Sequence, residues 1–253
     1  MENNKLGHVS TLKLQITAPI PMDHDMDIRA LVLMTGKNGT GKTVILKLNW
    51  IICAMAYIAV VGNLEDPALS EVAQFYIDNT FDDHDIDGII GGTFESGASL
   101  EITCKEGKVL TSVMIKDPSV TIASHPIYMS SETRLISESV RYMRYCKSCS
   151  ILFKVAENEE NLKSVLHLYK LYDALFMESL LIRLNAGFTL TQITELQTRL
   201  DTFEQDLTIK GIKISDKQDD ILYTADGEKW SSVRLLGAGH QALLTMTLGG
   251  MTI

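Results

Sequence analysis

The sequence predicts an α/β fold that is organised around a strand, a glycine-rich loop and a helix. The apolar run at 30–34 (ALVLM) is typical of a buried strand, and the run at 44–48 (VILKL) is typical of the opening of a helix. Between the two runs the chain matches the pattern G-x-x-x-x-G-K-[ST] with Gly36, Gly41, Lys42 and Thr43. A loop of this pattern between a strand and a helix binds phosphate, so the sequence predicts nucleotide binding.

The residue types in this loop explain the expected chemistry. Glycines at 36, 39 and 41 allow positive φ and a close approach of the backbone to a ligand. Successive N–H groups can then converge on phosphate oxygens, helped by the positive end of the helix dipole. We expect Lys42 to reach the β- and γ-phosphates of ATP and the Thr43 hydroxyl to bind Mg²⁺. A glycine-rich turn that matches by chance is the alternative. The full set of expected nucleotide-binding residues is Gly36, Lys37, Asn38, Gly39, Thr40, Gly41, Lys42, Thr43 and Val44.

Composition places the chain among globular proteins. Its 253 residues allow one large domain or two small ones, with 45% hydrophobic and 22% charged residues. The net charge of −9 does not favour a nucleic-acid partner, although a local basic groove would still permit one. The first five residues lack the apolar core of a signal peptide, and the apolar stretch at 50–62 is shorter than the roughly 20 residues that span a bilayer. We therefore expect a cytoplasmic protein with no membrane partner.

Two further motifs are better explained without a metal site. Cys146 and Cys149 form one C-x-x-C without a second pair, which favours two free thiols over a zinc site. The segment from Asp83 to Gly88 resembles the opening of a calcium loop. However, Phe94 occupies the position of the required bidentate acid, so we expect a solvated acidic turn.

Periodicity and turn residues predict the other elements in order. The expected elements of the first half are a strand at 12–17, an acidic turn at 23–27, helices at 42–61 and 66–79, and an antiparallel meander over 88–126. Those of the second half are helical segments at 133–149, 158–185 and 190–207, and a hairpin set with strands at 209–214, 221–224 and 228–230. We expect a single ATPase head over 1–253, made of a β-rich nucleotide-binding lobe (1–130), a helical subdomain or insertion (131–208) and a final hairpin segment (209–253).

Three features together resemble the ATPase head of the ABC superfamily, in the group of structural-maintenance-of-chromosomes, RecF and OLD-nuclease proteins. The loop has the form G-x-N-G-x-G-K-[ST], with Asn38 and Gly39 as that group favours. A strand, an acidic turn and a second strand precede it in the usual order. The segment at 236–241 (LGAGHQ) stands where the family's signature, L-S-x-G-x-x, would lie. The resemblance covers most of the chain, and the loop is its most specific part.

The resemblance implies a P-loop NTPase sheet with an antiparallel β-meander and a helical subdomain, which binds ATP and Mg²⁺. It further implies a dimer, with itself or with a hetero-partner, in which the signature contacts the nucleotide of the opposite subunit. The residues at that contact would be Leu236, Gly237, Ala238, Gly239, His240 and Gln241. Gly237 replaces the family's serine, which removes one hydroxyl donor. DNA repair, chromosome maintenance or phage defence would be the setting.

One family element, the Walker B strand with its Asp-Glu pair, has no match. It should follow the signature, but the chain ends at Ile253, so the C-terminal part of the ABC-like fold is expected to be incomplete. The run at 173–178 (DALFME) lies within a helical pattern. Because those acids hold Mg²⁺ and polarise the attacking water, their absence makes hydrolysis doubtful. The chain could be a fragment, a partner could supply the acids, or the site could bind without turnover.

Two other functions compete with the ATPase head. One is a nucleotide-gated binding module with little or no hydrolysis of its own. The other is a small-molecule P-loop kinase, in which Arg134, Arg141 and Arg144 would form the lid, although the long β-meander fits that class poorly.

Overall fold

The computed structural model describes residues 6–18, 20–29, 34, 41–62, 64, 66–81, 86–114, 136, 139, 142, 170–202, 207–217 and 220–251. The chain forms two compact units, Met1–Pro126 and Ile127–Ile253. The predicted strand at 30–34 lies outside the described residues, apart from Met34.

The first unit contains a five-stranded antiparallel sheet with strand order β2-β1-β3-β4-β5. Its strands are β1 (Val9–Ala18), β2 (Met22–Asp27), β3 (Asp87–Phe94), β4 (Ser99–Lys105) and β5 (Lys108–Met114). The structure confirms the predicted first strand and the predicted antiparallel meander as far as residue 114. The rest of that meander, at 115–126, lies outside the described residues.

The acidic turn predicted at 23–27 is wrong, because these residues form strand β2 at the edge of the sheet. β2 pairs antiparallel with β1 in a register that places Asp27 opposite Thr11 and Asp25 opposite Lys13. Asp23, Asp25 and Asp27 alternate along the strand and are all exposed. An edge strand tolerates such charges because its outer side faces water, and the charges discourage pairing with another chain.

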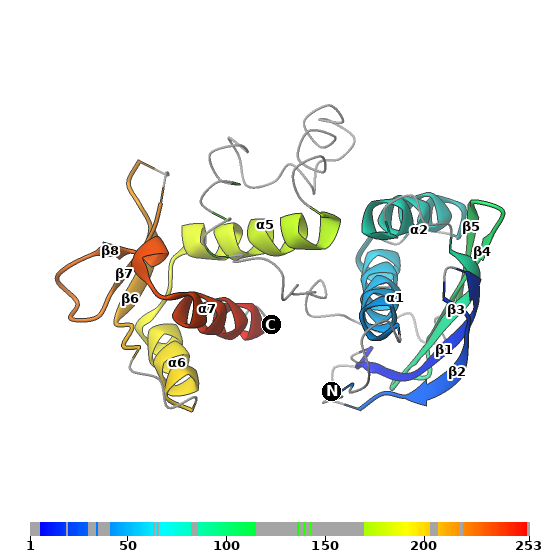
Figure 1. Ribbon diagram of the computed structural model, residues 1–253, viewed down its shortest axis with the longest axis horizontal. Coiled ribbons are helices and arrows are strands. Elements are labelled where there is room, and N and C mark those ends of the chain that lie inside the picture. Colours follow the sequence, from blue (N-terminus) through cyan, green and yellow to red (C-terminus); the bar gives the residue numbers. More distant parts are fainter. Residues whose placement is uncertain are drawn as a thin grey trace. The chain divides into compact units, whose positions relative to one another are not determined.

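Helices α1 (Lys42–Gly62) and α2 (Asp66–Phe81) cover one face of this sheet (Figure 1). α1 contacts β3 and β4, whereas α2 contacts α1 and β5. Every second strand residue points toward the helices, and most of the buried residues on this face are apolar. One row of paired residues crosses the middle of this face: Leu14, Ile90 and Ile102, all fully buried. Both helix predictions are confirmed.

Adjacent glycines in β3 face opposite sides of the sheet. A Cβ added at Gly92 would overlap Cγ2 of Ile52 in α1. A Cβ added at Gly91 would instead make an ordinary contact, 3.5 Å from the Cβ of Lys13. The missing side chain at Gly92 therefore lets α1 lie directly against the sheet.

Side chains from the first turns of α2 satisfy amide groups of β5. The Thr111 N–H donates to the Ser70 hydroxyl over 2.9 Å, and the Val113 N–H donates to the Asp66 carboxylate over 3.2 Å. The Thr111 hydroxyl also donates to the Asp66 carbonyl over 3.0 Å. These contacts fix α2 along the β5 edge of the sheet.

Of the described helices, α1 alone is long and apolar enough to cross a membrane, judged by length and composition. Core helices of soluble proteins pass the same test. Eight α1 residues are buried within the first unit: Leu48, Trp50, Ile51, Ile52, Ala54, Met55, Ala56 and Ala59.

In its described part from residue 170 onward, the second unit combines helices α5, α6 and α7 with a small antiparallel sheet of order β6-β7-β8. α7 contacts α5 and α6, and α5 also contacts β6. The elements are α5 (Leu171–Ala186), α6 (Leu190–Asp201), β6 (Gly211–Ile214), β7 (Ile221–Thr224), β8 (Ser231–Ser232), the 3₁₀ turn η2 (Val233–Leu235) and α7 (Ala238–Gly250). Thr189 caps α6 in a reciprocal capping box with Gln192.

Two predicted boundaries in this unit are wrong. α6 ends at Asp201 instead of 207, and Gln197 of the helix bonds the returning chain, accepting from the Ile209 N–H over 2.6 Å. The last strand lies at Ser231–Ser232 instead of 228–230. The Asp226 carboxylate accepts the N–H groups of Glu228 and Lys229, both over 2.8 Å, which turns the chain there.

The predicted helix at 133–149 is described only at Ile136, Ser139 and Tyr142. Each of these residues is helical and fully buried. The predicted helix at 158–185 is described from residue 170 onward, where it forms α5.

Candidate nucleotide-binding site and signature-like segment

The described part of the glycine-rich loop is its end, at Gly41. This residue is buried and has φ +80°, a left-handed conformation that favours glycine. A Cβ at this position would also overlap Cε of Met22, at the start of β2. The conformation therefore favours glycine at this position, whereas the flexible end of Met22 could move to admit a methyl group. Gly36, Lys37, Asn38, Gly39 and Thr40 lie outside the described residues.

Helix α1 begins immediately after this glycine, at Lys42. Its first turn closes through the Ile45 N–H, which donates to the Gly41 carbonyl over 2.9 Å. The N–H groups of the first helical residues have no acceptor within the helix, and they carry the positive end of its dipole. No acidic residue lies in this turn. Thr43 is exposed, whereas Lys42 and Val44 are half-buried. The first turn of α1 therefore places no negative charge against an anion.

The described residues contain no group of three or more His, Cys, Asp or Glu side chains that could hold a metal ion by themselves. Mg²⁺ commonly binds through one or two protein oxygens together with substrate phosphates and water. The exposed hydroxyl of Thr43 fits that role as a single protein ligand. The chemistry at the start of α1 therefore suits a metal that arrives with a nucleotide.

Two cysteines of the first unit have thiols of low reactivity. Burial raises the pKa of the Cys53 thiol to about 12. Burial also raises the pKa of Cys104 to about 12, with further contributions from the negative charges of Asp87 and Asp78. Neither thiol is a nucleophile near neutral pH. Cys146 and Cys149 lie outside the described residues, as do Asp83, His84 and Asp85 of the acidic segment.

The signature-like segment lies in the second unit, at the start of α7. Gly237 precedes the helix with φ −58° and ψ 154°, and no side chain caps the helix. Gly237, Ala238 and Gly239 are exposed, and His240 is half-buried. A Cβ added at either glycine would meet nothing within 4 Å, so there is room beside both residues. The first turn contains no acidic residue. An anionic group would therefore meet no acidic side chain in this turn.

The two ends of the segment are buried. Leu236 packs inside the unit, and Gln241 is only 4% exposed. The Gln241 side-chain amide donates to the Leu236 carbonyl over 2.7 Å and to the Arg234 carbonyl over 3.4 Å. Gln241 therefore holds the backbone that precedes the helix, and residues 237–240 are the part of the segment that reaches the surface.

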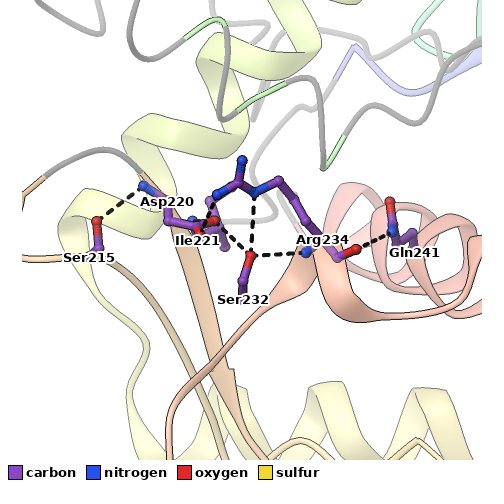
Figure 2. Close-up of polar contacts among 6 residues, drawn as sticks. All are labelled: Ser215, Asp220, Ile221, Ser232, Arg234 and Gln241. Atoms are coloured by element: carbon purple, nitrogen blue, oxygen red, sulfur yellow. Dashed lines mark hydrogen bonds and ion pairs between the residues drawn. The ribbon is translucent and has the colours of Figure 1, made fainter.

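A polar cluster next to this segment was missed by the sequence analysis (Figure 2). The Arg234 guanidinium forms an ion pair with the Asp220 carboxylate over 2.8 Å. The Ser232 hydroxyl donates to the same carboxylate over 3.0 Å. A serine two residues before an arginine is a weak signal, and the partner aspartate lies 14 residues away from the arginine. Only the folded hairpin brings these residues together.

The acids at Asp173 and Glu178 lie in helix α5, as their helical pattern predicts. Both side chains are buried. They do not lie at the end of a strand, which is where the Walker B acids of the resembled family would be.

A scan against known protein families and a search of curated proteins found no match to this chain.

Proposed function

We propose that this protein is an ABC-type P-loop ATPase head that binds ATP with Mg²⁺ through residues 36–44. The observation that carries the proposal is the start of α1. A buried glycine with φ +80° leads directly into a helix that begins Lys-Thr and has no acid in its first turn. The same residues complete the G-x-x-x-x-G-K-[ST] pattern, and both features favour phosphate binding.

Each residue of the helix start has a distinct role in this proposal. The amide groups at 42–44 bind phosphate oxygens, and the Lys42 ammonium pairs with the outer phosphates. Thr43 offers its hydroxyl to the metal. When bound, Mg²⁺ would offset the negative charge of the phosphates. Gly41 sets the direction in which the first amide groups point.

The start of α7 is proposed to meet the nucleotide of a second subunit. Residues 237–240 are the accessible part of the segment, and there is free space beside both glycines. Backbone N–H groups at a helix start can bind a phosphate without a side-chain hydroxyl. The glycine at 237 is compatible with that role, although it lacks the serine hydroxyl of the family pattern.

A second candidate is a nucleotide-gated module that binds ATP and does not hydrolyse it. It is favoured by the placement of Asp173 and Glu178 within helix α5 instead of at the end of a strand. Measured ATP turnover above that of a Lys42 variant would exclude this candidate.

The test is the affinity for ATP of the wild type and of Lys42→Ala, measured by calorimetry in the presence of Mg²⁺. A lost charge-assisted contact predicts affinity that is weaker by about 10- to 100-fold. Lys47→Ala is the matched control, because it removes the same charge from the same helix. Lys47 donates to the Thr80 carbonyl over 3.4 Å, so we expect this variant to lose some stability and to keep its ATP affinity.

Sedimentation with and without ATP tests the dimer. The wild type should sediment as a dimer only with ATP, and Lys42→Ala should remain monomeric in both states. Equal ATP affinity in the wild type and Lys42→Ala would refute the proposed function.

A further inference from the structure

The Asp220 carboxylate accepts three donors from three successive parts of the second unit. These donors are the N–H of Ile221 at 2.8 Å, the Ser232 hydroxyl at 3.0 Å and the Arg234 guanidinium at 2.8 Å. The Asp220 side chain is only 15% exposed. Hydrogen bonds to an ionised acceptor are stronger than neutral ones, and partial burial reduces the screening by water. These three contacts thus hold the Asp220 side chain in place immediately before β7.

The contacts continue from Asp220 to the signature-like segment. The Ser232 hydroxyl accepts from the Arg234 N–H over 3.2 Å and from its Nε over 3.4 Å. The carbonyl of Arg234 in turn accepts from Gln241, and so does that of Leu236. Figure 2 shows these side chains between the strand end and α7. The chain of contacts therefore joins the sheet to the backbone on both sides of residues 237–240.

Residues 237–240 by themselves do little to fix the orientation of this helix start. They include two glycines, which have the largest conformational freedom in the unfolded chain, and no side chain caps α7. An anion site built from backbone amides depends on where those amides point before the anion arrives. The direction of the helix start must therefore come from contacts outside residues 237–240.

We propose that Asp220 is a positioning residue, which holds the start of α7 through Ser232 and Arg234 in the orientation that a second subunit's nucleotide requires. This inference rests on the proposed function, because it concerns the dimer contact of the same ATPase head. Asp220 itself touches no nucleotide. Its effect is on the order of the segment and, through that order, on ATP-dependent dimerisation.

The test compares Asp220→Asn with the wild type as full-length chains. Asparagine keeps the shape and one acceptor oxygen but removes the charge that pairs with Arg234. Asp216→Asn is the matched control, because Asp216 lies in the same β6–β7 connection, is 97% exposed and approaches Lys213 only at 3.9 Å. Hydrogen exchange is measured without nucleotide, peptide by peptide. ATP affinity and ATP-dependent sedimentation are then measured on the same samples.

For Asp220→Asn we expect about tenfold faster exchange in peptides covering residues 233–242, the size of effect of one lost charge-assisted contact. The other described peptides should exchange at wild-type rates. ATP affinity should not change, because the P-loop is intact, whereas dimerisation with ATP should weaken at least fivefold. A residue with only a structural role would not separate these two quantities. Asp216→Asn should behave as the wild type throughout.

Unchanged exchange at 233–242 in Asp220→Asn would overturn the positioning role, and so would an equal acceleration in all peptides of the second unit. A wild type that binds ATP and never dimerises would overturn the functional part of the inference together with the dimer contact. A wild type that does not bind ATP would overturn the proposed function. The exchange data, which need no nucleotide, would still decide whether Asp220 orders the segment.

Discussion

Replacing Gly92 with alanine tests how α1 is held against the sheet. The new methyl group would overlap Cγ2 of Ile52. Ile52 is fully buried in α1, and a close-packed core leaves a buried side chain little room to turn. Either the helix moves away from β3 or the isoleucine leaves its preferred rotamer. Both responses affect the helix whose first turn carries Lys42 and Thr43.

The expected cost combines two opposing effects. Forcing one extra methyl group into a packed core costs about 1–3 kcal/mol. Replacing glycine in a strand returns about 0.5–1 kcal/mol, because alanine has less freedom to lose on folding. Taking the middle of both ranges, we expect Gly92→Ala to lower the free energy of unfolding of the first unit by about 1 kcal/mol. With a typical urea dependence, the midpoint should fall by roughly 0.5–1 M.

The assay is urea unfolding followed by the fluorescence of Trp50. This side chain is buried in α1, and its ring lies 5.3 Å from that of Tyr76. The chain has two tryptophans, so a Trp230→Phe background leaves Trp50 as the single tryptophan and restricts the signal to the first unit. Gly91→Ala is the matched control, because its methyl group points to the other face of the sheet. It should be neutral or slightly stabilising.

A double variant checks the assigned contact. Ile52→Ala alone should destabilise the unit by about 2–5 kcal/mol, because it leaves a cavity. Combined with Gly92→Ala, the total should fall short of the sum by about 1 kcal/mol, since the new methyl group partly fills that cavity. Equal midpoints for Gly92→Ala and Gly91→Ala would refute the reasoning, and strict additivity in the double variant would show that the two residues do not meet.

Two other outcomes are expected from the first unit. Gly41→Ala should lower ATP affinity by at least tenfold, because alanine resists φ +80° and its methyl group would displace Met22; calorimetry with wild-type affinity would contradict this. At pH 8 the folded protein should leave Cys53 and Cys104 unmodified by iodoacetamide, because burial raises the pKa of both thiols to about 12 and keeps them protonated. Peptide mass spectrometry should find both cysteines labelled in urea, and labelling at the rate of a free thiol without urea would show that they are accessible.

The regular elements of the first unit could be predicted because their signals are local. The helix after the loop follows from a long apolar run, and the meander follows from short alternating segments with tight polar turns. β2 could not be predicted in this way, since its three aspartates disfavour a strand by composition. The strand forms because β1 offers it a continuous register, which is a tertiary effect. The early end of α6 also depends on a distant contact, the bond between Gln197 and the chain at 209.

The residues of the candidate sites also differ in whether their sequence signals are local. The pattern around Gly41 and Lys42 has fixed spacing, so the sequence could locate it without a structure. Gln241 is buried and bonds the backbone that precedes α7. This contact depends on how the chain folds before the helix, so a match to the signature pattern does not predict it. The pairing of Asp220 with Arg234 depends on the hairpin between them. Positions that bind a ligand through a local motif are readable from sequence, whereas positions that orient the motif are not.

The contacts of α2 with β5 restrict how the five-stranded sheet can be extended. At that edge, the amides of Thr111 and Val113 are already bonded to α2 and cannot pair with a further strand. At the opposite edge, an additional strand would lie beside the aspartates of β2. Basic or hydroxyl side chains suit that position, and acidic ones would be repelled. A further strand is thus excluded from the β5 edge by the side chains of α2. At the β2 edge a further strand is disfavoured only if it carries acidic side chains.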